Sequence, residues 1–176
     1  MPYPTLPGRK FEYDVGGGSV YYGNDINDIT TALTTEQMAL LNGIGNTSIV
    51  ISKDLYITEA IRTVWVFLPE KYVVAGLGMI HKVYTTGGAS GSVAVAGSAD
   101  STNGLDGTWI NATLPNGAIP SNLTDDDVWR DSIQPCTFSE AIKVLRVRYF
   151  SSYGGIGGSR VFIYALHIYG VKAAGE

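Results

Sequence analysis

The sequence predicts an all-β protein of antiparallel strands, and three features of its 176 residues indicate this fold class. Glycine supplies 22 residues and tyrosine 11, while charged residues make up 16% of the chain, a balance that favours turns and strands over long solvated helices. From Ser48 onward, β-branched and aromatic runs alternate with turn residues, which is the spacing of a sandwich or barrel. No helical run of about a dozen residues interrupts them, so the crossovers that parallel strands need are missing.

Residues 1–47 differ in composition from the rest and are predicted to form an extended N-terminal arm. Pro2, Pro4 and Pro7 hold the start of the chain extended, and three glycines at 16–18 follow as a flexible joint. Such a segment becomes ordered when it lies along a neighbouring subunit, because the contacts made on assembly offset the entropy that it loses.

A short helix over about residues 35–42 is predicted within this arm. Thr34 and Gln37 have the spacing of a capping box, and Gly43 ends the helical pattern. A helix of about two turns needs tertiary contacts to persist, so we expect it to pack against other parts of the structure.

Residues 48–176 are predicted to form one β-domain. The run at 64–68 is apolar on both alternating faces, so we expect it in the middle of a sheet covered on both sides, with Pro69 ending the strand. Arg146 and Arg148 share one face of a strand, where we expect acidic residues of an adjacent strand to pair with them; an acidic partner surface is the alternative. The other candidate strands are the runs at 49–51, 73–84, 93–96, 142–150 and 161–169.

Charge and cysteine content exclude several classes of partner. With a formal net charge of −4 and no cluster of Lys and Arg, the chain is not expected to bind nucleic acid or an anionic membrane surface. A single cysteine and two histidines are too few for a zinc, copper or iron site. No apolar run reaches the roughly 18 residues of a membrane span, and the start lacks the order of a signal peptide, so we expect a soluble protein made in a cytoplasm.

Five motifs follow Trp65 in order along the chain: VAVAGSAD (93–100), GTW (107–109), WR (129–130), KVLRVRY (143–149) and ALHIYG (165–170). This series resembles the discoidin or F5/8 type C group of galactose-binding-like domains. In that group a strand leads into a Ser-x-Asp-Gly loop closed by Trp, a later strand carries Arg-x-Val-Arg-Val, and the last strand ends in Tyr-Gly. The resemblance covers roughly residues 60–171 and implies an antiparallel jelly-roll β-sandwich over 48–176.

The opening PTLPGRKFEYD (4–14), followed by a jelly roll, also resembles small virion proteins of tailed bacteriophages. This resemblance implies a virion structural protein that decorates the capsid or attaches to the tail. Its partners would be other virion proteins and further copies of itself, for example in a trimer. We expect the arm to attach to neighbouring subunits by burying aromatic side chains. The aromatic residues concerned are Tyr3, Phe11, Tyr13, Tyr21 and Tyr22.

A carbohydrate-binding module that recognises a host receptor is the alternative function. Aromatic side chains at strand ends and in loops stack on sugar rings, although the same side chains also anchor subunit contacts. A sugar site would place planar polar groups beside such a ring. The candidate glycan-binding residues are Trp109, Trp129, Arg130, Asp100 and Asp106.

Neither catalysis nor a cofactor is predicted. The sequence has no Gly-x-Ser-x-Gly elbow and no Walker loop, and His81 and His167 lie in strand-like runs without a partner acid or nucleophile beside them. Asp100, Asn103 and Asp106 are close enough in sequence to offer oxygens to a calcium ion, but an Asx turn that bonds to itself explains the same pattern.

Overall fold

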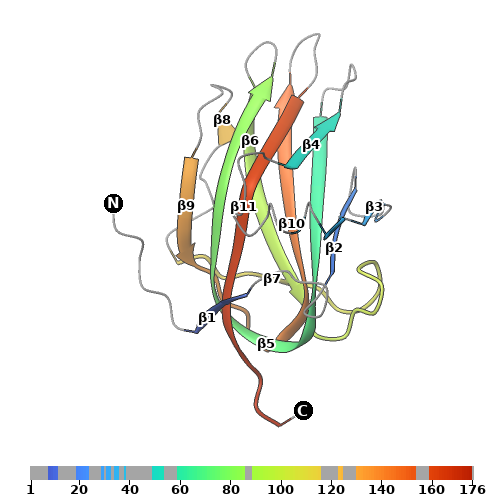
Figure 1. Cartoon of the computed structure of the whole chain (residues 1–176), viewed down its shortest axis with the longest axis vertical. Coiled ribbons are helices and arrows are strands. Elements are labelled where there is room, and N and C mark those ends of the chain that lie inside the picture. Colours follow the sequence, from blue (N-terminus) through green and yellow to red (C-terminus); the bar gives the residue numbers. More distant parts are fainter. Residues whose placement is uncertain are drawn as a thin grey trace.

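The computed structural model contains strands joined by loops, and every strand pair that it records is antiparallel (Figure 1). The structure describes residues 8–11, 19–23, 29, 31–32, 34–35, 38, 49–53, 59–85, 89–115, 123–124, 130–153 and 159–175. The strands in this part of the chain are β1 (Arg9–Phe11), β2 (Ser19–Gly23), β3 (Thr31–Ala32), β4 (Ile49–Lys53), β5 (Glu59–Thr85), β6 (Ala89–Ser98), β7 (Ile110–Asn111), β8 (Leu123–Thr124), β9 (Arg130–Pro135), β10 (Ile142–Tyr153) and β11 (Ser159–Lys172). No helix among these residues is long and apolar enough to cross a membrane.

Strand β5 belongs to both layers of the structure. Its first part pairs with β2 and β10. On its other edge β10 pairs with β6, and β6 in turn pairs with β7 and β8. Its second part pairs with β9 and β11, and β11 also pairs with β1 and β4. Figure 1 shows β5 turning at the lower end of the molecule, between one arm on the right and one on the left. The predicted all-β, antiparallel β-sandwich is therefore confirmed.

The turn of β5 occurs at residues 68–71, which include Pro69. Phe67 and Tyr72 both pair with β10, and Lys143 is the one β10 residue between their partners, so four β5 residues lie opposite one residue of β10. This extra length is a bulge, which bends a strand and tolerates a proline that donates no hydrogen bond. The prediction that Pro69 ends the strand is wrong, because the strand bends there and continues.

The ends of β10 and β11 meet at the same corner. Tyr72 pairs with the first residue of β10 and with Lys172, the last residue of β11. Just beyond β11, the amide of Ala173 donates to the carbonyl of Lys71 over 2.9 Å. The corner therefore collects side chains from three strands that are distant in sequence.

The core lies between the two layers. It includes Val66 of β5, Leu145 of β10 and Leu166 of β11, each fully buried. Trp65 is also fully buried but lies outside this cluster, and its indole donates to the carbonyl of Gly104. Because successive residues of a strand face opposite sides, this arrangement confirms that the 64–68 run is covered on both faces. Burial raises the pKa of the Cys136 thiol to about 12.

The described part of residues 1–47 contacts the body of the same chain. β1 pairs with β11, β2 pairs with β5, and Val20 is 1% exposed. Thr35 and Met38 are helical, Met38 is buried in the core, and its amide donates to the carbonyl of Thr34 over 2.9 Å. The rest of the expected helix at 35–42 lies outside the described residues.

Of the arm aromatics, Tyr21 has a described side chain. Its ring meets Phe67 edge-on, with centroids 5.4 Å apart, so it packs against its own chain. Phe11 and Tyr22 lie in β1 and β2, while Tyr3 and Tyr13 lie outside the described residues. A boundary at residue 47 and attachment to neighbouring subunits stay predictions.

We predict that Leu145→Ala lowers the free energy of unfolding by about 2–5 kcal/mol, because it opens a cavity in the core. Val171→Ala is the matched control: Val171 is 52% exposed, and we expect a change within about 0.5 kcal/mol. Urea denaturation followed by circular dichroism measures both. Equal losses in the two variants would contradict this assignment of the core.

Candidate functional site

Loop 98–109, which joins β6 to β7, is folded around the carboxylate of Asp106. This carboxylate accepts hydrogen bonds from the Ser101 hydroxyl (2.9 Å), the Thr102 amide (2.7 Å) and hydroxyl (2.5 Å), and the Asn103 amide (3.2 Å). Bonds to the ionised form favour it, and those from Thr102 lower the pKa of Asp106 most. Asp106 therefore holds the loop in one conformation while it is ionised.

Asp100 closes the other side of the loop. It accepts from the Ser98 hydroxyl (2.9 Å) and from the Thr108 amide (2.7 Å) and hydroxyl (3.3 Å). The Thr108 amide is the main reason that the pKa of Asp100 is lowered. A Cβ at Gly107, where φ is +80°, would lie 2.7 Å from an Asp100 oxygen, so the loop needs glycine there.

The side-chain oxygens proposed as calcium ligands, those of Asp100, Asn103 and Asp106, accept hydrogen bonds from the loop itself. Asn103 Oδ1 accepts from the amides of Leu105 (2.8 Å) and Asp106 (2.9 Å), which confirms an Asx turn. Hydroxyl and amide groups of the loop likewise donate hydrogen bonds to the carboxylates of Asp100 and Asp106. Among the described residues, no group of three or more His, Cys, Asp or Glu side chains is placed to hold a metal.

Two tryptophans fix the loop against the sheet. Trp65 Nε1 donates to the Gly104 carbonyl over 3.1 Å, and Trp109 Nε1 donates to the Asp106 carbonyl over 3.0 Å. The guanidinium of Arg146 lies 4.0 Å from the centre of the Trp109 ring, a cation–π contact that covers one face of the indole. Trp65 and Ala96 stand opposite Arg146 on the two adjacent strands, so the acidic residue expected at these paired positions is not there.

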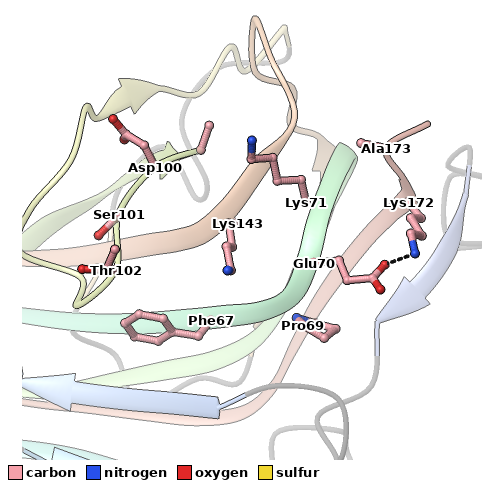
Figure 2. A pocket seen from close by; sticks show the side chains of 11 residues that line it. Phe67, Pro69, Glu70, Lys71, Asp100, Ser101, Thr102, Lys143, Lys172 and Ala173 are labelled. Atoms are coloured by element: carbon pink, nitrogen blue, oxygen red, sulfur yellow. Dashed lines mark ion pairs between the residues drawn. The ribbon is translucent and has the colours of Figure 1, made fainter. Parts of the chain in front are cut away.

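A pocket of about 440 Å³ lies between this loop and the turn of β5 (Figure 2). We call it the corner pocket, and it is lined by Phe67, Pro69, Glu70, Lys71, Ala99, Asp100, Ser101, Thr102, Lys143, Lys172 and Ala173. Figure 2 shows Asp100, Ser101 and Thr102 on the loop side, Phe67 and Pro69 along the lower edge, and the Glu70–Lys172 ion pair at the opposite side. The pocket combines an aromatic ring with hydroxyl and charged groups.

Three ammonium groups and two carboxylates line the corner pocket. Lys172 pairs with Glu70, and this hydrogen bond is the main reason that the pKa of Lys172 is raised. Both side chains are about half exposed, so solvent screens the pair. Lys143 projects from the start of β10 between the two walls of the pocket.

Three of the predicted glycan-binding residues share loop 98–109, where the Trp109 indole bonds to the Asp106 carbonyl, but their side chains have different surroundings. Asp100 lines the corner pocket, whereas Asp106 is held inside loop 98–109 and Trp109 stacks with Arg146. Arg130 begins β9, where its backbone pairs with His81, and Trp129 lies outside the described residues.

The sequence analysis missed the lysines of the pocket. Lys71, Lys143 and Lys172 are far apart in sequence and meet through the turn of β5. A signal was present, because lysines lie beside Pro69 and at the ends of two predicted strands. It becomes informative only when those strand ends are known to be neighbours.

Loop 98–109 should lose stability in acid. Because the pKa of Asp106 is lowered on folding, its contribution is complete above the pKa of an unfolded aspartate, about 3.9, and is lost as pH falls through the lower folded value. We expect the thermal midpoint to fall more steeply below about pH 4 in the wild type than in Asp106→Asn, which should be less stable at neutral pH. Thermal unfolding across a pH series measures this, and parallel curves would refute it.

No protein-family model and no curated protein matches the sequence. Among solved structures, the chain is similar to the C-terminal domain of a chitobiase from Bacteroides fragilis, with 10% identity, a TM-score of 0.50, and coverage of 94% of this chain and 99% of that one. It also matches chitosan-binding module 1 of a chitosanase/glucanase from Paenibacillus sp. IK-5 (15% identity, TM-score 0.46, 90% and 100% covered). A third match is the F5/8 type C domain of a Bacteroides fragilis protein (12%, 0.43, 95% and 100%). The first likeness shows a shared β-sandwich fold.

Proposed function

We propose that this chain is a non-catalytic carbohydrate-binding module and that the corner pocket is its ligand site. The observation that carries the proposal is the combination of the Phe67 ring with hydroxyl and charged side chains around one space. Sugars present apolar C–H faces and hydroxyl edges, so they need both kinds of surface. A volume of about 440 Å³ suits one or two sugar rings.

The two walls of the pocket are organised before any ligand arrives. Loop 98–109 is fixed by the bonds to Asp100 and Asp106, and Phe67 is held in β5 and makes a T-shaped contact with Tyr21. A site that needs little ordering loses less free energy on binding. The chain shares its fold with a domain of a chitobiase, and this supports the proposal that it acts together with carbohydrate-active enzymes.

The purified chain should bind glycans on an array, and Phe67→Leu should weaken the strongest interaction by about tenfold, the factor for 1.4 kcal/mol, because the variant loses ring stacking while keeping apolar bulk. Val73→Ala, a change at a half-exposed position outside the pocket, is the control. Isothermal titration calorimetry measures each affinity, and thermal unfolding checks the fold.

Trp109→Ala distinguishes the corner pocket from the alternative glycan site expected from the sequence. Loss of binding in Trp109→Ala with full binding in Phe67→Leu would move the site to the Trp109 side of the loop. An array without signal would refute a glycan-binding function.

A role as a phage virion subunit stays a prediction, and it includes the partners and location expected from the sequence. Removing residues 1–30 would also remove β1 and β2 from the sheet, so lost incorporation would have two explanations. The double variant Tyr3→Ser, Tyr13→Ser leaves both strands in place. If the segment attaches the chain, this variant should show reduced co-assembly with capsid or tail proteins at an unchanged thermal midpoint. Full occupancy on particles would exclude attachment through these tyrosines.

A further inference from the structure

The charge of the corner pocket differs in sign from that of the whole chain. The protein has a formal net charge of −4, yet the pocket is lined by three lysines and two acidic residues. The lysines come from the β5 turn, the start of β10 and the end of β11. A local cationic surplus favours an anionic ligand at this position even on an acidic protein, because charges beyond about 8 Å are largely screened at physiological ionic strength.

Both carboxylates of the pocket already have donors. Glu70 pairs with Lys172, and Asp100 accepts bonds from Ser98 and Thr108 of its own loop. These bonds lower the pKa of Asp100, so it stays ionised and engaged at neutral pH. The two acidic side chains therefore form part of the walls of the pocket through their own hydrogen bonds and ion pair.

Lys143 is placed differently. It is exposed, it lies alone opposite the four-residue turn of β5, and among the described residues no carboxylate pairs with it. In Figure 2 its ammonium group lies between Phe67 and the Glu70–Lys172 pair. A sugar ring beside Phe67 would place a substituent next to this charge.

We propose that the corner pocket selects glycans that carry an anionic group, a carboxylate or a sulfate, and that Lys143 binds this group. The inference rests on the proposed function and assigns its ligand class. A charge-assisted hydrogen bond from an ammonium to an anionic oxygen is roughly twice as strong as a neutral one. The pocket should therefore discriminate by charge among sugars of the same shape.

The test is a glycan array on which each uronate, sialate or sulfate glycan is printed beside its uncharged counterpart, the methyl ester or the unsulfated sugar. We expect the acidic member of the preferred pair to bind about tenfold more tightly, the factor for 1.4 kcal/mol. Calorimetry on that pair gives both affinities. Carboxylate and sulfate pairs, read separately, show which anion is recognised.

Three variants test the assignment to Lys143. Lys143→Gln should reduce the preference to about twofold or less, because it should weaken binding of the acidic member more than binding of the uncharged member. Lys82→Gln removes the same charge near the far end of β5 and should keep the preference. Glu70→Gln frees the Lys172 ammonium at the wall of the pocket and should increase the preference.

The outcomes separate the two proposals. Equal binding of both members, or a preference unchanged in Lys143→Gln, overturns the anionic assignment and leaves carbohydrate binding standing. No binding to any glycan overturns both. A preference that Lys82→Gln abolishes equally would reflect overall charge and would also overturn the role of Lys143.

Discussion

The structure depends on one geometric constraint, the bend of β5 at residues 68–71. A single strand that belongs to both layers must reverse direction, and it does so by placing four residues opposite Lys143. The bend lets β5 pair with β10 on one side and β11 on the other, which brings the start of one and the end of the other to Tyr72. The corner pocket is a direct consequence, because its lysines lie on the bend and at these strand ends.

Loop 98–109 shows how an acidic loop becomes rigid through its own donors. The carboxylates of Asp100 and Asp106 accept hydrogen bonds from hydroxyls and amides within twelve residues of chain. Each bond favours the ionised form, so the donors of the loop itself hold both carboxylates in place. Trp65 then anchors it to the sheet through the Gly104 carbonyl, which fixes one wall of the pocket relative to Phe67 on the same strand.

Local patterns predicted the strands and the loop, but the site needed long-range information. The apolar run at 64–68 and the Asx turn at Asn103 depend on neighbours in sequence, and both are confirmed. The prediction that Pro69 ends the strand was wrong because the effect of a proline depends on the partner strand. Within a bulge, Pro69 lies where the strand bends, and the strand continues beyond it. Arg146 stacks on Trp109, a contact that depends on how loop 98–109 folds, which strand spacing alone does not specify.

For the proposed glycan ligand of the corner pocket, charge is a better guide than aromatic content. Aromatic rings here have structural partners: Trp65 bonds to the loop, Trp109 stacks with Arg146, and Tyr21 supports Phe67. Among the residues that line the pocket, Phe67 is the one aromatic ring that can stack on a sugar, and stacking is tolerant of sugar identity. The half-exposed Glu70–Lys172 pair adds little to folding, since solvent screens it, but it holds one ammonium at the wall of the pocket. For the proposed ligand, selectivity then comes from the polar groups, and among these Lys143 has no described carboxylate as a partner.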